Sequence, residues 1–250
     1  MTQACLQRAR QLCLFISLLL ISSWAAASGL QVTPTTLSLN AKQNADGLVL
    51  SNTGEGAIHA QVRVYRWTQN EQGDQLAPSQ GLVVSPPMLQ IPVSGQQMVR
   101  VIRVGPPPNG VGAVEEAYRL AVDELPIDSP GGPGLHFVVH YSVPIFVEPF
   151  GLTATSPSLQ WKLVREGQRV ALRVSNQGNG HAQLANIAFV DGAGKRTEIV
   201  PGLLGYVLPG STMHWTLTQP VSVFGTGGTL EIMVNGQKTT QNLSLAGGPP

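Results

Sequence analysis

The stretch from Leu135 to Glu148 constrains this chain more than any other, because its apolar residues alternate along its whole length. In an extended strand, successive side chains point to opposite faces, so residues two apart share a face. The pattern therefore predicts a long β-strand over 135–147. One of its faces would carry an unbroken apolar series: Leu135, Phe137, Val139, Tyr141, Val143, Ile145 and Val147.

Pro144 lies within this predicted strand and has no N–H to donate to a neighbouring strand. Proline occurs in sheets mainly on edge strands, so we expect an edge strand at least near Pro144. An edge strand with an apolar face exposes unpaired backbone groups and invites pairing with another chain. The sequence thus predicts either that the protein covers this strand or that pairing is its purpose.

The composition favours an all-β protein with two domains. Charged residues make up 12% of the chain, 28 glycines and 19 prolines are present, and no long helical repeat of apolar residues occurs. A length of 250 residues allows two domains, each of about 100 residues. The formal net charge of +1 provides no strong field to attract nucleic acid, so binding must depend on local surfaces.

The first 27 residues have the pattern of a secretory signal peptide. Two arginines precede an apolar run over 12–21, and three alanines follow at 25–27. The run is shorter than the roughly 20 residues that a membrane-spanning helix needs, which favours a cleaved leader over a retained anchor. Both cysteines, Cys5 and Cys13, lie in this leader, so we expect a mature protein without disulfides or cysteine-ligated metals.

Short apolar strands separated by turns fill two halves of the remaining chain. We expect residues 28–148 to form one domain and residues 149–250 another, because the same pattern starts again after Glu148-Pro-Phe-Gly151. Each half contains the sequence Ser-Asn-x-Gly-x-Gly after an apolar strand, at 51–56 and at 175–180, which indicates a duplicated module. About seven predicted strands per half are typical of immunoglobulin-like β-sandwiches.

Two segments of the first half are assigned from proline and polarity. Residues 29–39 are predicted as the first strand, with Pro34 marking an edge or a kink. Residues 69–81 contain few apolar side chains and are predicted as a polar loop.

No combination of residues predicts catalysis or metal binding. His136 and His140 are four residues apart, but on a strand this spacing separates them by about 13 Å, too far for one metal ion. The adjacent acidic pairs at 115–116 and 123–124 would point to opposite faces and are expected to be solvated. The short glycine motifs lack the strand–turn–helix context of a phosphate loop. We therefore expect no enzyme activity, no cofactor and no small-molecule substrate.

Arginines are concentrated in the predicted strands of the first half. Each can pair with a local acid or extend its guanidinium group at a sheet edge. Together they offer a surface able to bind a carboxylate through bidentate hydrogen bonds. These residues are Arg63, Arg66, Arg100, Arg103 and Arg119.

Several short segments, in their order and spacing, resemble the periplasmic pilus chaperones of the chaperone–usher pathway, the PapD-like proteins. The segments are Leu30-Gln-Val-Thr-Pro, Leu50-Ser-Asn-Thr-Gly, Met98-Val-Arg100, Tyr118-Arg-Leu-Ala-Val-Asp-Glu-Leu-Pro126 and Val139-His-Tyr-Ser-Val-Pro-Ile-Phe-Val-Glu-Pro149. The resemblance implies two immunoglobulin-like domains at an angle, in an L-shaped arrangement, and a location in the periplasm. It also implies that the last strand of the first domain is lent to an incomplete pilus subunit until an outer-membrane usher takes the subunit over.

By position, the resemblance implies which side chains enter the subunit. The residues that match the donor residues of the family are Leu135, Phe137, Val139 and Tyr141. These four also belong to the apolar series that the alternation predicts on its own. Strand addition of this kind combines main-chain hydrogen bonds with pockets for alternate side chains.

The resemblance fails at one place, the anchor for the terminal carboxylate of the subunit. Well-known members use an arginine on the first strand and a lysine on the donor strand, but the matching positions here are Thr36 and Pro144. The sequence Tyr-Ser-Val-Pro-Ile-Phe is similar to the archaic branch of the family, for which a relocated basic anchor is expected. Arg100 and Arg103 are our candidates, and because alternation puts them on opposite faces, we expect one of them to face the subunit.

Two other classes of function remain open from the residues alone. A two-domain immunoglobulin-like surface adhesin or structural protein would be exported beyond the periplasm and would pair 135–147 within its own fold. A secreted β-sandwich hydrolase would need histidines and carboxylates gathered in one cleft. Whether the free chain covers its edge strand by self-association also stays open.

Overall fold

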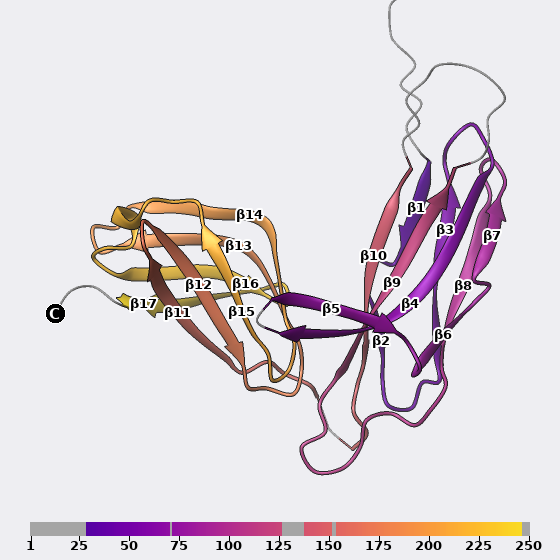
Figure 1. Cartoon of the computed structure of the whole chain (residues 1–250), viewed down its shortest axis with the longest axis horizontal. Helices are drawn as coiled ribbons and strands as arrows, with labels where there is room; N and C mark the ends of the chain where they lie inside the picture. The colour runs from indigo at the N-terminus through magenta and orange to yellow at the C-terminus, as the bar shows by residue number, and fades with distance from the viewer. Residues whose placement is uncertain (1–28, 71, 127–137, 152–153, 247–250) are drawn as a thin grey trace, which may run out of the picture.

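The computed structural model describes residues 29–70, 72–126, 138–151 and 154–246. They form two β-sandwich domains set at an angle to one another (Figure 1), which confirms the predicted all-β, two-domain fold class. Over these residues the sole helix is the 3-10 turn η1 (Val221–Val223), and no helix is long and apolar enough to cross a membrane. The predicted leader, residues 1–27, lies outside the described residues.

The N-terminal domain consists of two facing sheets. One has the strand order β1-β3-β8-β6, and the other has the order β2-β10-β9-β4-β5 with β7 paired to β4. The strands are β1 (Leu30–Thr33), β2 (Leu37–Leu39), β3 (Ala45–Asn52), β4 (Ile58–Asn70), β5 (Gly73–Pro78), β6 (Leu82–Ser85), β7 (Met88–Ile91), β8 (Gln96–Arg103), β9 (Glu116–Leu125) and β10 (His140–Val147).

The C-terminal domain repeats this two-sheet plan. Its sheets have the orders β15-β12-β11-β18 and β14-β13-β16-β17. The strands are β11 (Leu159–Glu166), β12 (Arg169–Asn176), β13 (Ala182–Asp191), β14 (Arg196–Val207), β15 (Thr212–Leu217), β16 (Gly228–Val234), β17 (Gln237–Leu243) and β18 (Leu245–Ala246).

Alternate residues of the strands fill a separate core in each domain. In the N-terminal domain, Leu50, Val101 and Leu120 come from three strands of the two sheets and are fully buried. In the C-terminal domain, Leu172 and Phe189 occupy the equivalent space between the sheets. Burial of such side chains supplies the main stabilisation of a chain that we expect to lack disulfides.

The two Ser-Asn-x-Gly-x-Gly sequences form the same turn in both domains. Asn52 and Asn176 are buried, and each side-chain amide donates to the carbonyl of the second glycine, at 2.7 Å and 2.8 Å. Each also accepts the N–H of the first glycine at 2.9 Å. Because the buried amide pairs with backbone groups of the turn on both its donor and its acceptor side, this residue fixes the turn in each domain. The shared geometry supports a duplicated module.

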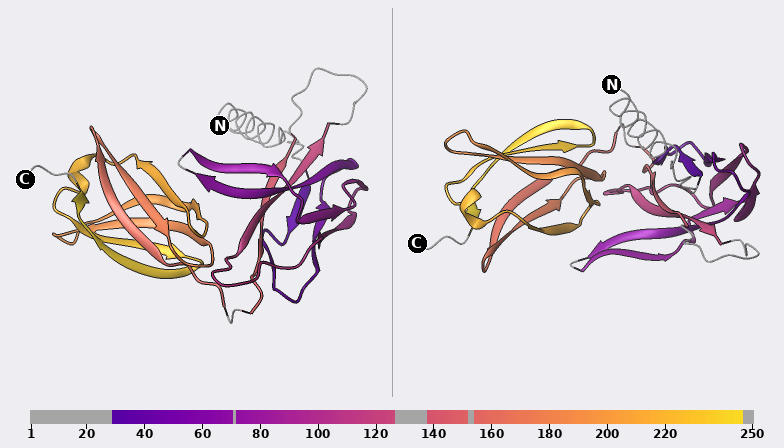
Figure 2. Two further views of the ribbon diagram at one scale, coloured as in Figure 1. Left: turned by 60° about the horizontal axis from the view of Figure 1, so that its bottom comes forward. Right: turned by 90° about the horizontal axis from the view of Figure 1, so that it is seen from above.

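Two segments differ from their predictions. Residues 29–39 form two strands rather than one, because the chain leaves the first sheet after Thr33 and enters the second at Leu37. Residues 69–81 are not a loop, because β4 continues to Asn70 and pairs with β5 in a hairpin. No residue of β5 is buried, so apolar alternation does not mark this strand. The hairpin reaches toward the C-terminal domain (Figure 2).

An aromatic cluster joins the domains. Trp67 and Phe146 pack with Tyr206, and the rings of Trp67 and Tyr206 meet edge-on with centroids 5.3 Å apart. The side chain of Gln69, on the hairpin, donates to the backbone carbonyl of Tyr206 at 2.9 Å and accepts the N–H of Leu208 at 2.8 Å. Buried rings and paired polar groups together connect the two domains at this surface.

Charged groups enclose this cluster on both sides. The His181 ring is stacked on the Phe146 ring with centroids 3.5 Å apart, and His181 Nδ1 lies 2.7 Å from Oε1 of the buried Glu115. The Arg119 guanidinium lies 3.7 Å above the Trp67 ring. Burial lowers the pKa of Arg119, while the charge of the nearby Asp74 raises it. These contacts link residues of the two domains and favour one orientation between them.

Candidate functional site

β10 has a strand neighbour along its full length on one side only. It pairs antiparallel with β9 from His140 to Val147. On the other side, β2 pairs with it in parallel along Ile145–Val147. Among the strands that the structure describes, none pairs with this side of His140–Pro144. We call this segment, 140–144, the open edge.

The backbone groups of the open edge point away from β9 at every second residue. Val139 exchanges hydrogen bonds with Glu124: its carbonyl accepts the backbone N–H at 3.0 Å, and its own N–H donates to the carboxylate at 3.1 Å. Because alternate residues of an antiparallel strand turn to opposite neighbours, His140 and Ser142 direct their N–H and C=O groups outward. Pro144 ends this series, because it lacks an N–H and its carbonyl accepts the Thr36 hydroxyl at 3.4 Å.

The apolar series of β10 serves its own domain from Tyr141 onward. Val143, Ile145 and Val147 are buried in the N-terminal core. Tyr141 packs partly against the same core, and its hydroxyl donates to the Leu30 carbonyl on β1 at 2.7 Å. This bond connects the edges of the two sheets beside the open edge. Much of the predicted ladder is therefore core.

The residues before the open edge are the remaining candidates for contacts with a partner. Val139 is partly buried, and its neighbour Val138 is 55% exposed. Leu135 and Phe137 lie outside the described residues. The assignment of Leu135, Phe137, Val139 and Tyr141 as donor residues therefore stays a prediction.

β10 is an edge strand before Pro144, as expected, but not after it. β2 covers Ile145–Val147, so these residues have strand neighbours on both sides. Phe146 is also buried on the opposite face, against the C-terminal domain. The sequence analysis missed this role of Phe146, although four consecutive apolar residues at 144–147 indicate a strand buried on both faces.

A charged cluster connects the first residue of the open edge to the strands behind it. His140 Nδ1 lies 2.5 Å from Asp123 Oδ1, and Arg63 donates to Asp123 Oδ2 at 2.7 Å. Burial would raise the pKa of Asp123, but hydrogen bonds from Arg63 and His140, with their charges, lower it below its ordinary value. The Asp123 carboxylate therefore stays ionised at neutral pH. Through it, the side chain of His140 on β10 is held against β9.

The two candidate anchors lie on β8, in the sheet that does not contain β10. Arg100 is exposed and stands opposite Gly47 on β3. Arg103 is partly buried, and one of its terminal nitrogens donates to the Ala41 carbonyl at 3.1 Å and to Asn44 Oδ1 at 2.9 Å. Its other two nitrogens are buried and have no hydrogen-bond partner among the described residues. The two arginines thus differ in surroundings, as alternation predicts.

The positions that match the usual anchor pair of the family are in direct contact. The Thr36 hydroxyl donates to the Pro144 carbonyl at 3.4 Å. Neither side chain carries a charge. Across the described ranges, no group of three or more His, Cys, Asp or Glu side chains is able to hold a metal ion.

The family comparison agrees with this geometry. Residues 29–153 match the family described as pili and flagellar-assembly chaperone, PapD N-terminal domain. The chain belongs to this family. Among curated proteins, no match is found. The family resemblance stated from short segments is therefore confirmed over the half of the chain that contains the open edge.

Solved structures of pilus chaperone systems share the fold. A chain of the CsuC–CsuE chaperone–tip adhesion subunit complex, from the archaic Csu pili of Acinetobacter baumannii, matches with a TM-score of 0.67 and 23% identity over 86% of this chain and 98% of its own. A chain of the Salmonella enterica SafA pilin–SafB chaperone complex matches with a TM-score of 0.60 and 18% identity, over 87% of this chain and 97% of its own. The E. coli chaperone DraB matches with a TM-score of 0.58 and 17% identity, over 87% of this chain and 97% of its own.

Proposed function

We propose that this pilus-assembly chaperone binds pilus subunits by adding its open edge to them as a strand and delivers them to an outer-membrane usher. The observation that carries the proposal is the side of His140–Pro144 that pairs with no strand among the described residues, preceded in the sequence by the alternating apolar residues of 135–139. Two structures with the same fold are complexes of a chaperone with a tip subunit or a pilin, which supports subunits as the class of partner.

Strand addition would use both the backbone and the side chains of this region. His140 and Ser142 would supply outward N–H and C=O groups to the subunit strand. Leu135, Phe137 and Val139 would fill pockets of the subunit, with about 1.5–3 kcal/mol for each buried side chain, or about 4.5–9 kcal/mol in total before ordering costs. Tyr141 would add less, because part of it already packs on the chaperone's own core.

The proposal includes the domain limits and the location of the protein. Residues 1–27 would be removed on export to the periplasm, residues 28–148 would form the chaperone domain, and residues 149–250 the second domain. This boundary falls between β10, which ends at Val147, and β11, which begins at Leu159. Transfer to the usher by strand exchange would release the subunit, so the function requires neither enzyme activity nor a cofactor.

Mutations in the apolar series test the donor strand. The protein is co-expressed with candidate pilus subunits, and co-purification is measured for the wild type and for Phe137→Asp combined with Val139→Asp. We expect the double variant to lose the subunit, because two carboxylates cannot enter apolar pockets unpaired. Val138→Asp is the matched control, since Val138 points to the other face of the strand and should leave binding intact. A folded double variant that retains the subunit would favour the surface-protein alternative instead.

Charge removal at the two arginines tests the carboxylate anchor. A subunit carboxylate would form an exposed pair with Arg100, or would reach the buried unpartnered nitrogens of Arg103 only after a local rearrangement of the chain. Arg100→Gln and Arg103→Gln are compared singly and together for subunit binding, and thermal unfolding checks that each variant is folded. Arg165→Gln, on the C-terminal domain, controls for the change in net charge. Undiminished binding by the double variant would show that neither arginine is the anchor.

A further inference from the structure

Three basic side chains form a row across the outer face of the C-terminal domain. Lys162 on β11 stands directly opposite Arg173 on β12, and Arg173 stands directly opposite His214 on β15. All three are exposed. Because opposite residues of neighbouring strands lie about 5 Å apart, the row is about 10 Å long. We call these three residues the basic row.

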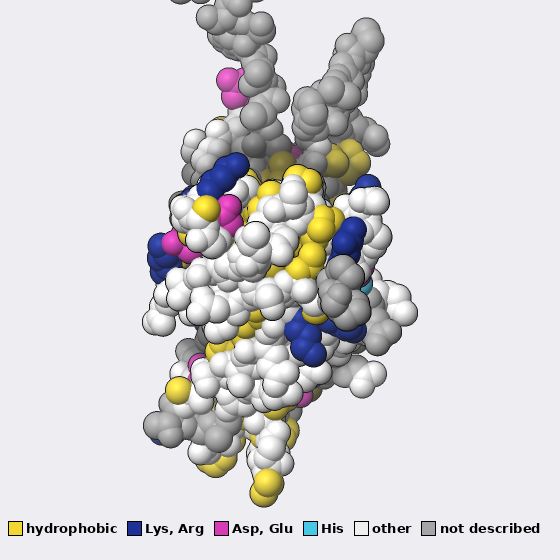
Figure 3. Space-filling view, turned by 90° about the vertical axis from the view of Figure 1, so that its left-hand side faces the viewer, with side chains coloured by type: hydrophobic (Ala, Val, Ile, Leu, Met, Phe, Trp, Pro, Cys, Tyr) yellow, Lys and Arg dark blue, Asp and Glu magenta, His cyan; other side chains and the backbone are white. Residues whose placement is uncertain are grey.

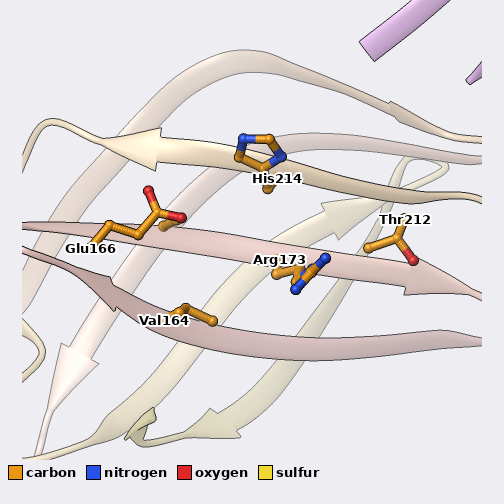
Figure 4. Close-up of a pocket in the computed structure, with 6 residues that line it drawn as sticks. Val164, Glu166, Arg173, Thr212 and His214 are labelled. Atoms are coloured by element: carbon orange, nitrogen blue, oxygen red, sulfur yellow. The ribbon is translucent and has the colours of Figure 1, made fainter. Parts of the chain in front are cut away.

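The basic row carries no balancing acid at its own level. Like charges directly opposite one another destabilise a sheet, so such a row needs a compensating anion to be favourable. Within the part of the chain that the structure describes, Lys162, Arg173 and His214 form no ion pair. Glu166 lines the same hollow at its end away from Thr212 (Figure 4), and within the sheet it stands directly opposite Arg169.

Hydrogen-bond donors and a hollow of suitable size accompany these charges. Arg173 and His214 line a hollow of about 240 Å³ together with Thr212 (Figure 4). The hydroxyls of Thr212 and Ser175 hydrogen-bond to one another at 2.7 Å, and whichever donates, the other keeps its hydrogen for a further acceptor. Lys162 borders the adjoining hollow with Arg173 and both hydroxyls. The site thus offers donors and positive charge to an oxyanion.

The surroundings of the row set it apart from ordinary surface charge. Figure 3 shows several Lys and Arg side chains gathered on the right-hand side of that view, with bands of hydrophobic side chains interrupted by polar surface elsewhere. Arg196 and Lys238 of the same domain both contact Glu231, whereas Arg165, Arg169 and Lys195 form no ion pair among the described residues and do not stand opposite another basic residue. What distinguishes the row is therefore the register of basic side chains on three neighbouring strands.

We propose that the basic row binds an oxyanion of the phosphate type, either free phosphate or the phosphate of an anionic lipid headgroup. The planar guanidinium of Arg173 matches two phosphate oxygens, and Lys162 adds a compact charge beside it. His214 donates an N–H and adds charge when protonated. The site lies on the second domain, away from the open edge, so an anion held here leaves the subunit-binding strand accessible.

A titration of the purified protein with inorganic phosphate tests the site directly. Amide chemical shifts are followed by NMR, with chloride replacing phosphate at equal ionic strength. We expect saturating shifts confined to the strands of the basic row, and an affinity lowered about tenfold or more by Arg173→Gln, the effect of losing a charged hydrogen bond. Lys195→Gln, an exposed lysine in a turn of the other sheet, removes one charge elsewhere and should change nothing.

A second measurement distinguishes free phosphate from a lipid source. The protein is sedimented with vesicles of phosphatidylcholine, with and without phosphatidylglycerol. The site would be assigned to lipid headgroups if the protein binds only the anionic vesicles, does not respond to inorganic phosphate, and loses vesicle binding in each of the variants Arg173→Gln and Lys162→Gln. No response in either measurement, or a response that both variants retain, would overturn the proposal. Neither outcome affects the subunit-binding proposal, which depends on the other domain.

Discussion

The edge strands β10 and β17 occupy comparable places in the two domains but differ in chemistry. β17 is the last strand of its sheet, and six of its seven residues are polar: Gln237, Lys238, Thr239, Thr240, Gln241 and Asn242. β10 is buried over its last five residues and leaves its other side open along 140–144. Lysine and other polar residues protect exposed edges from pairing with other chains. The C-terminal domain follows this rule, whereas the N-terminal domain does not.

The difference lies in side chains and in which strand changes sheet, since the two domains share one plan. In each, an opening strand and the last strand meet in a short parallel pair, β2 with β10 and β11 with β18. In the N-terminal domain the opening strands β1 and β2 divide between the sheets, and in the C-terminal domain the closing strands β17 and β18 do so. Because β2 has three residues, it leaves most of β10 uncovered. The same two-sheet plan thus leaves an open edge on β10 in the N-terminal domain, to which we attribute subunit binding.

Truncation of a buried residue in β10 should have the largest effect. Ile145 is fully buried in the core, so Ile145→Ala should lower the free energy of unfolding by about 2–5 kcal/mol. Thr240, exposed on β17, is the matched position, and Thr240→Ala should stay within about 0.5 kcal/mol of the wild type. Urea denaturation measures both variants. Equal losses would mean that the two edge strands contribute alike to their domains, contrary to the comparison.

Replacement of the buried turn asparagines should have equal effects in the two domains. Asn52→Ala removes the partner of the buried Ile91 carbonyl, and Asn176→Ala that of the Val207 carbonyl, together with the bonds to the turn glycines, with an expected loss of about 1–3 kcal/mol in each domain. Urea denaturation of each variant measures the loss. Gln237→Ala, at an exposed position, is the control. A large loss for one asparagine alone would show that the duplicated turn stabilises one domain more than the other.

Local patterns predicted those features whose cause is local. The alternation around Ile145 predicted β10, and the repeated Asn-Gly sequences predicted turns that share their hydrogen bonds between the asparagine and the two glycines. The β4–β5 hairpin was missed, because its pairing involves exposed polar residues without periodic apolar burial. The stacking of Phe146 on His181 joins residues of different domains. Neither side chain indicates its partner by sequence spacing, so this contact required the packed structure.

The hydroxyl of Tyr141 sharpens the comparison at the open edge. Tyr141→Phe removes the bond to the Leu30 carbonyl, and we expect a loss of about 0.5–1.5 kcal/mol in stability. Amide hydrogen exchange should become faster in β1 and in 140–142, where the bond connects two sheets, and stay unchanged in β17. Tyr65→Phe is the control, since the Tyr65 ring lies on β4 away from this edge. Unchanged exchange in β1 would show that the bond does not hold the edge in place.

Acid should weaken both domains slightly through one carboxylate each. The pKa of Asp123 is lowered by Arg63 and His140 against the opposing effect of burial, and the pKa of Glu231 is lowered first by its hydrogen bond from Arg196. A carboxylate with a lowered pKa in the folded state stabilises the protein above its ordinary pKa, and this contribution is lost as pH falls through the lowered value, below about pH 4. Asp123→Asn and Glu231→Gln should therefore make the thermal midpoint depend less on pH between neutral pH and about pH 3, with smaller differences at high salt.

Asp123→Asn should also weaken the contact between His140 on β10 and the neighbouring strand β9, whereas Glu231→Gln has no effect on the open edge. If the acid dependence persists unchanged in both variants, other carboxylates cause it, and the charged cluster at His140 positions the open edge without contributing to stability.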